Sequence, residues 1–131
     1  MKYRKFPAYM VVVITLLCLL GCAAGPGLAD YSYDLACDYT LVRSSGHQIS
    51  ICHKGSNLAG VHIEAKVVEV AWNDRYIVAK RLGLVNENDH NRYQVPDEDD
   101  VSYWIIDAHT DTLYGGYNLG EFKAKQKELN I

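Results

Sequence analysis

The four cysteines carry the most reactive side chains in this chain, and their positions divide them into two groups. Cys18 lies inside the uncharged stretch 8–20, and Cys22 follows that stretch closely. Cys37 and Cys52 lie in the more polar remainder of the chain. A thiol can be modified, oxidised to a disulfide, bound to a metal or used as a nucleophile. Which of these reactions a cysteine undergoes depends on the segment that carries it.

The first 21 residues have the arrangement of a secretory signal. Lys2, Arg4 and Lys5 precede the uncharged stretch 8–20. This stretch fits the apolar core of a signal peptide and is shorter than the roughly 20 residues that a membrane-spanning helix needs. We therefore expect a signal helix over residues 1–21 that is removed on export. A plain secretory signal and an uncleaved anchor are the alternatives.

The residues Leu19, Leu20, Gly21 and Cys22 resemble the lipobox of bacterial lipoprotein precursors. The resemblance implies that the Cys22 thiol is alkylated with diacylglycerol, that the signal is cut before it, and that the new amino terminus is acylated. Leu20 departs from the usual pattern, in which a smaller residue is more common. Two or three acyl chains hold a protein firmly, whereas one binds marginally. The expected location is the cell membrane, on its extracytoplasmic side.

Removal of the signal leaves 110 of the 131 residues, which is enough for one domain. The signal contains three of the 13 basic residues and none of the 16 acidic ones, so the mature chain has a formal charge of −6. A domain this acidic lacks the basic face that nucleic acids require, which excludes them as partners. We expect residues 22–29 to be a flexible tether and residues 30–131 to be a single domain.

The domain is expected to be mainly β (α+β), an antiparallel meander of five or six strands with a C-terminal helix. A change of phase at Val67-Val68 predicts a β-bulge in one long strand over 61–72. The polar segment 82–100 is expected to be a long exposed loop. Strand candidates lie at 31–35, 39–43, 47–52, 61–72, 76–81, 101–107 and 112–117.

The C-terminal segment has the signals of a helix over 118–130. Asn118 is the expected N-cap, and Glu121 stands three residues later, as in a capping box. Leu119, Phe122 and Leu129 form a narrow apolar stripe that can lie against a sheet.

Cys37 and Cys52 are the two thiols left in the exported domain, which predicts a disulfide between them. Two free thiols are the alternative. With a three-residue loop at 44–46, Cys37 lies across from His53, so the bond requires a two-residue turn or a bulge around Asp38. We expect the bulge, because aspartate is a poor strand residue.

The remaining polar residues form no pattern that is typical of an enzyme or a metal site. The acidic run 97–100 lacks the spacing of a calcium loop. Neither a GxSxG elbow nor a glycine-rich phosphate loop is present. We therefore expect no catalytic residues, no cofactor and no metal. The five histidines are dispersed along the chain, at His47, His53, His62, His90 and His109.

Segments 71–81 and 103–122 resemble a family of short uncharacterised bacterial lipoproteins of unknown function, a resemblance that implies no chemistry. Tyr103 and Trp104 are expected to be ordinary half-buried strand residues. The alternative is an outward ring beside Tyr114 or Tyr117 that stacks on a sugar ring or a peptide. The expected function is a membrane-anchored binding or interaction module of the cell envelope, whose ligand is a protein or a cell-wall component. The alternative is an inhibitor or immunity-type protein that acts on a cell-surface enzyme through the acidic segment 86–100.

The lipid attachment makes a direct prediction. Cys22→Ala removes the thiol that would be alkylated, so the variant should remain an unprocessed precursor. A palmitate analogue fed to the cells should label the wild-type protein and not the variant. Equal labelling of both would contradict the lipoprotein assignment.

Overall fold

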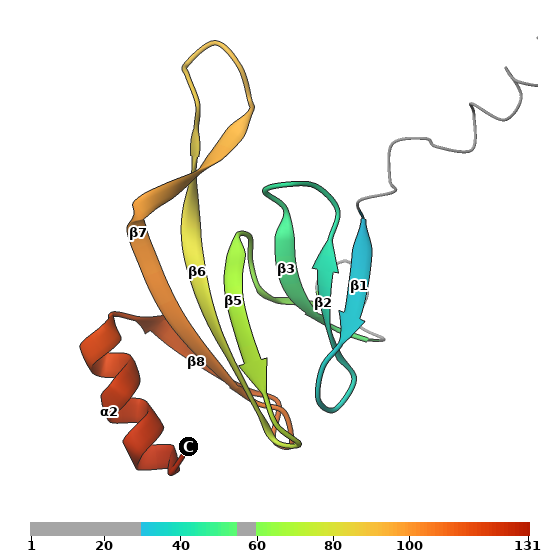
Figure 1. The fold of residues 1–131 in the computed structure, drawn as a ribbon, viewed down its shortest axis with the longest axis vertical. Coiled ribbons are helices and arrows are strands. Elements are labelled where there is room, and N and C mark those ends of the chain that lie inside the picture. Colours follow the sequence, from blue (N-terminus) through green and yellow to red (C-terminus); the bar gives the residue numbers. More distant parts are fainter. Residues whose placement is uncertain (1–29, 55–59) are drawn as a thin grey trace, which may run out of the picture.

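The computed structural model describes residues 30–54 and 60–131. The signal segment 1–21, Cys22 and the tether 22–29 lie outside the described residues, so their assignments stay predictions. The described part forms two antiparallel sheets of four strands each, followed by one helix (Figure 1). The protein is therefore β-rich with a C-terminal helix, as the sequence predicts. It has eight strands in two sheets, however, where one meander of five or six was expected.

The first sheet contains the four N-terminal strands in the order β1-β2-β3-β4. Neighbouring strands follow one another in the sequence, and each pair is antiparallel. All four residues of β1 are exposed, because this strand lies at an edge. The strands are β1 (Tyr31–Asp34), β2 (Tyr39–Arg43), β3 (Ile49–His53) and β4 (Val61–Ile63).

The second sheet has the order β5-β6-β7-β8, and its two central strands are much longer than its edges. Their pairing runs from Tyr76 with Asp107 out to Asn86 with Gln94. The far half of this pair extends beyond both sheets as an arm (Figure 1). The strands are β5 (Val67–Trp72), β6 (Tyr76–Asn86), β7 (Gln94–Asp107) and β8 (Thr112–Tyr117).

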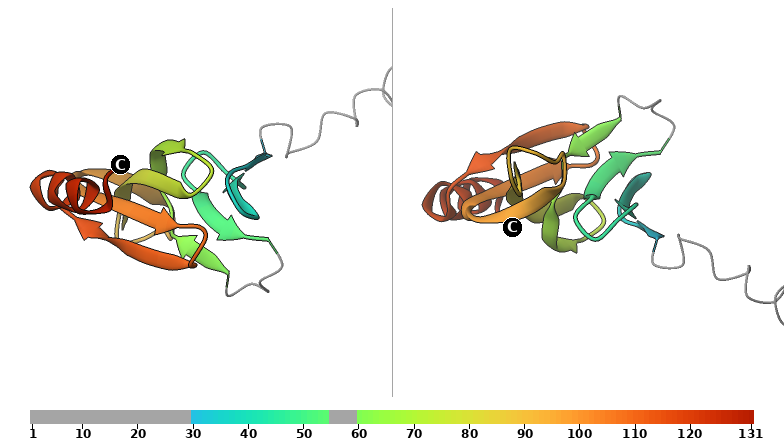
Figure 2. Two further views of the ribbon diagram at one scale, coloured as in Figure 1. Left: turned by 90° about the horizontal axis from the view of Figure 1, so that it is seen from below. Right: turned by 90° about the horizontal axis from the view of Figure 1, so that it is seen from above.

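The core lies between the two sheets, because both contribute to one cluster of buried side chains. The end-on views show the sheets as two layers, with the helix on the far side of the second sheet (Figure 2). The cluster contains Tyr39, Ile51 and Ile63 from the first sheet, and Val67, Ile77, Ala79 and Ile106 from the second.

The prediction of one long strand over 61–72 is wrong, because the chain crosses from one sheet to the other within this segment. β4 ends at Ile63 and β5 begins at Val67. The backbone of Lys66 exchanges two hydrogen bonds of 3.0 Å with Leu82, which start the pairing with β6. The apolar alternation continues through the crossing, and for that reason the pattern gives no sign of it.

The bulge predicted in the same segment is confirmed. Val67 pairs with Arg81, but Glu69 already pairs with Lys80, so Val68 is an extra residue in β5. The bulge reverses the phase of the side chains. Val67 and Val70 therefore both reach the core, as the change of phase in the sequence predicted.

The prediction of a long loop over 82–100 is also wrong, because most of this segment belongs to the paired strands of the arm. Only residues 87–93 connect β6 to β7. Leu82 pairs with Val101 and Gly83 with Asp97, so the exposed residues Glu98 to Asp100 bulge out of β7. The Asp100 carboxylate fills the space above Gly83, where an added Cβ would meet it at 1.9 Å. Proline and aspartate are loop signals in the sequence, and cross-strand pairing overrides them here.

The helix α2 (Leu119–Leu129) confirms the predicted cap. The Glu121 amide donates to the Asn118 side chain at 3.0 Å, and the Asn118 amide donates to the Glu121 carboxylate at 2.9 Å. Phe122 stacks on Tyr103 of β7, with 5.0 Å between ring centroids. Leu119 remains exposed, so the expected apolar stripe contacts the sheet in part only.

Cys37 and Cys52 are free thiols, which contradicts the expected disulfide. The β2–β3 connection is longer than predicted, and the resulting register sets Thr40 across from Cys52. The chain does kink around Asp38, where Cys37 and Asp38 have φ values of 48° and 64°. The kink places the Cys37 thiol against the carbonyl of Asp74, at 3.6 Å.

Packing around Trp104 makes a prediction about stability. The indole packs on the core and covers Gly115, where an added Cβ would lie 1.9 Å from Cε3. Gly115→Ala should displace the ring and lower the free energy of unfolding by about 1–3 kcal/mol, the usual cost of overpacking. Denaturant titration measures the change.

Gly46→Ala is the matched control for this substitution, because an added Cβ at Gly46 meets nothing within 4 Å. In a Trp104→Ala background the cost of Gly115→Ala should largely disappear, since the clashing ring is gone. Equal costs with and without the indole would contradict the packing described.

Candidate functional site

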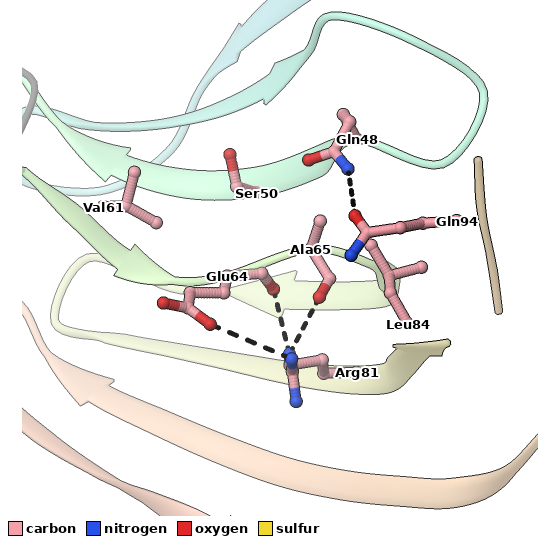
Figure 3. A pocket seen from close by; sticks show the side chains of 8 residues that line it. All are labelled: Gln48, Ser50, Val61, Glu64, Ala65, Arg81, Leu84 and Gln94. Atoms are coloured by element: carbon pink, nitrogen blue, oxygen red, sulfur yellow. Dashed lines mark hydrogen bonds and ion pairs between the residues drawn. The ribbon is translucent and has the colours of Figure 1, made fainter. Parts of the chain in front are cut away.

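A cleft of about 620 Å³ opens between the two sheets, beside the crossing from β4 to β5 (Figure 3). Both sheets contribute to its walls, so the cleft exists only because the sheets are joined at this point. Polar side chains outnumber apolar ones in its lining. The lining residues are Gln48, Ser50, Val61, Glu64, Ala65, Arg81, Leu84 and Gln94.

Arg81 of β6 connects the cleft to the crossing. Its Nε donates to the carbonyls of Glu64 at 3.2 Å and of Ala65 at 3.0 Å. Its Nη2 lies 4.0 Å from the Glu64 carboxylate. Figure 3 shows the guanidinium pointing toward both residues. The two opposite charges compensate each other, and the side chain of Arg81 is only 21% exposed.

Two glutamine side chains meet across the cleft. The Gln48 amide, from the β2–β3 connection, donates to the Gln94 amide oxygen of β7 at 3.4 Å (Figure 3). The hydroxyl of Ser50 adds a group that both donates and accepts. Amides and a hydroxyl bind neutral polar groups such as the hydroxyls of a sugar or the amides of a peptide.

An aromatic side chain lies next to the glutamine pair. A smaller hollow shares Gln48 and Gln94 with the cleft and is also lined by His47 and Tyr93. The His47 and Tyr93 rings meet edge to face, 5.8 Å apart, where the β2–β3 connection approaches the arm. Tyr93 is 56% exposed, so its face is accessible to a ligand that extends out of the cleft.

A second polar cluster ties the β7–β8 turn to the first sheet. The buried Tyr39 hydroxyl donates to the Asp111 carboxylate, and His62 Nε2 lies 3.7 Å from the same oxygen. The rings of His53 and His62 lie 4.9 Å and 5.1 Å from the Tyr39 ring. No sequence pattern indicates this cluster, because Tyr39 and Asp111 lie 72 positions apart.

The cluster perturbs the acidity of two of its members. Burial, followed by the hydrogen bond to Asp111, raises the pKa of the Tyr39 phenol well above its usual value. The same hydrogen bond lowers the pKa of the Asp111 carboxyl, and the nearby His62 adds to this effect. The phenol therefore stays protonated and Asp111 stays ionised, which suits a structural link between the sheets.

His90 and His109, the remaining histidines, are exposed. Over residues 30–54 and 60–131, no three His, Cys, Asp or Glu side chains are arranged to hold a metal ion. In the same residues no helix has the length and apolar character that a membrane crossing requires.

Exposed aromatic side chains gather at the edges of the two sheets. Tyr31 and Tyr33 of β1 and Trp72 of β5 are 45%, 60% and 44% exposed. Tyr33 and Trp72 meet edge to face with 6.1 Å between centroids. With Leu35, Leu41 and Val70 they line a shallow, almost entirely apolar hollow, which we call the aromatic patch.

The aromatic patch lies elsewhere than the sequence indicated. Tyr103 and Trp104 were expected to be half-buried strand residues, and an outward ring beside them was the alternative. The expectation is confirmed, since both are partly buried: Tyr103 stacks on the helix, and Trp104 packs on the core. The sequences of β1 and β5 do not predict the patch, because the two strands belong to different sheets and meet only in the folded domain.

Two hydrogen-bonded carboxylates predict how stability depends on pH. Asp111 accepts from Tyr39, and Asp107, at the end of β7, accepts from the Arg75 guanidinium at 2.7 Å and 3.1 Å. These hydrogen bonds lower the pKa values of both carboxyl groups in the folded state. The unfolded chain therefore binds protons first as the pH falls below about 4. The melting temperature should be constant near neutral pH and should fall below about pH 4.

Asp111→Asn should lower the melting temperature at pH 7 by a few degrees. Between pH 5 and pH 3 the melting temperature of this variant should fall less than that of the wild-type protein. Asp89→Asn, in the exposed connection of the arm, is the control and should match the wild-type protein. Calorimetry across this pH range measures both effects. An Asp111→Asn profile that is parallel to wild type would contradict the link.

Comparisons with known proteins identify the family and leave its function open. No curated protein and no solved structure matches the chain. One family model, described as a protein of unknown function (DUF3997), matches residues 36–131. This range covers all strands except β1, and it includes the cleft and the helix. The chain therefore belongs to the DUF3997 family of uncharacterised proteins.

Proposed function

We propose that this protein is a lipid-anchored binding module of the cell envelope that holds its ligand in the cleft between the two sheets. The anchor rests on the lipobox at Leu19 to Cys22. The binding role rests on one observation, the lining of the cleft. Uncharged donors and acceptors from both sheets converge there, on Gln48, Ser50 and Gln94.

The lining favours a neutral, polar and elongated ligand. Gln48 and Gln94 can each donate to and accept from hydroxyl or amide groups. Tyr93 lies beyond them and can stack on a sugar ring or a peptide side chain. A cell-wall glycan and an extended segment of an envelope protein both have this chemistry.

The contacts of the two charged side chains in the cleft favour binding over catalysis. Arg81 is held by two backbone carbonyls and faces the Glu64 carboxylate. A catalytic acid or base needs a position from which it can exchange a proton with a substrate. Arg81 instead has the position of a structural residue that fixes the floor of the cleft.

The arm supports a second candidate function, that of an inhibitor of a cell-surface enzyme. The arm protrudes from the body of the domain (Figure 1). Its bulge exposes the acidic residues Glu98, Asp99 and Asp100. A protruding acidic element is suited to a basic entrance on a partner, because opposite charges steer association.

One capture experiment separates the two functions. The full-length protein would be expressed in its host, cross-linked in intact cells and purified with its bound material. Gln48→Ala/Gln94→Ala should reduce capture about 10- to 30-fold, the effect of two lost hydrogen bonds worth about 1 kcal/mol each. Lys123→Ala, on the exposed side of the helix, is the matched control and should not change capture.

The outcome assigns the function. Loss of capture in the glutamine variant alone supports binding in the cleft. Loss only in Glu98→Gln/Asp99→Asn, with an enzyme as the captured material, would overturn cleft binding in favour of inhibition. Unchanged capture in both variants would contradict both functions.

A further inference from the structure

The aromatic patch lies at the end of the domain that is tied to the proposed anchor. Tyr31 is both the first residue of β1 and a member of the patch. It lies nine positions after Cys22 in the sequence. Because an extended chain spans at most about 3.3–3.6 Å per residue, Tyr31 stays within about 30 Å of the acylated residue. The anchor therefore keeps this patch within reach of the bilayer.

The chemistry of the patch suits the boundary between lipid and water. Tyrosine and tryptophan are enriched at membrane interfaces, since their rings are apolar and their polar tips can stay hydrated. Tyr33 and Trp72 are half exposed, and between them lies an apolar floor. Ordinary soluble surfaces seldom gather exposed aromatics in this way.

Basic side chains lie at the margin of the patch. The Arg43 guanidinium lies over the Tyr31 ring, 5.6 Å from its centroid. Lys66 lines the neighbouring hollow together with Tyr31, although Glu69 lines it too. The exposed acids Asp30 and Asp34 lie at either end of β1, so the margin carries both charges and suits zwitterionic headgroups, which also carry both.

We infer that the aromatic patch docks on the bilayer surface, with the rings of Tyr31, Tyr33 and Trp72 in the interfacial region. The inference rests on the lipid anchor of the proposed function. The tether makes docking an intramolecular event, so a patch too weak to bind membranes alone is sufficient. The domain then lies on the membrane in one orientation. The patch and the cleft share no lining residue, so the docked surface and the proposed ligand site are separate sets of residues.

Tryptophan fluorescence tests the docking directly. The chain has two tryptophans, so Trp104→Phe leaves Trp72 as the reporter in the mature protein. The acylated protein would be reconstituted into phosphatidylcholine vesicles, with and without lipids brominated near the headgroup. Brominated lipid should quench Trp72 by about half, and aqueous iodide should quench it several-fold less than it quenches the same mature protein without acyl chains in solution.

Two tyrosine variants identify the surface. Tyr33→Ser should restore iodide quenching and remove the quenching by brominated lipid. Tyr93→Ser changes an equally exposed tyrosine at the arm and should leave both unchanged.

Flotation of the vesicles separates the possible failures. If the protein floats with the vesicles, but iodide quenches Trp72 and brominated lipid does not, docking is overturned and the anchor stands. Shielding from iodide without quenching by brominated lipid would overturn docking too, and would indicate that a second copy covers the patch. Protein that does not float would overturn the anchor and the docking together.

Discussion

The hydrogen bonds between Arg81 and the crossing from β4 to β5 are the interaction on which the rest of the structure depends. The crossing residues, Glu64 and Ala65, leave one sheet before the next begins, so their carbonyls need partners outside a regular strand. Arg81 supplies both from a single side chain. The pairing of Lys66 with Leu82 then starts the second sheet. The turn of the chain at this point makes the two sheets face each other and opens the cleft next to it.

The same geometry explains where the two exposed surfaces lie. β1 and β5 are both edge strands, because each begins a sheet whose order follows the sequence. Their neighbouring edges bring Tyr33 and Trp72 together. The link from Tyr39 and His62 to Asp111 ties the β7–β8 turn to the first sheet. The sheets are thus held at the crossing and at this turn, with the apolar core between them.

Features with a local cause could be predicted from the sequence. The capping box at Asn118 and Glu121 depends on two residues in one turn of helix, and the bulge at Val68 shows in the phase of its own strand. The crossing and the arm depend on pairing over longer distances. Pro96 and Asp97 resemble a loop, and only their pairing with β6 makes them part of a strand. The cysteine pairing was wrong because it depended on the length of one connection, which the sequence left open.

The cleft could not be predicted for the same reason. Its two glutamines lie 46 residues apart, and neither belongs to a recognisable motif. Each is an ordinary polar residue until the arm and the β2–β3 connection approach each other. Sequence patterns therefore indicate where the protein is expected to be attached, whereas the site for a ligand emerges only when the sheets are assembled.

Hydrogen–deuterium exchange is the most direct test of the central claim that the cleft holds the ligand. Exchange would be compared between the free acylated protein and the complex recovered from the envelope. Binding in the cleft predicts slower exchange in the peptides that cover residues 48–50, 61–65 and 81–84, with helix α2 unchanged. Protection confined to the helix or to the acidic bulge at 98–100, with the cleft peptides unchanged, would contradict it.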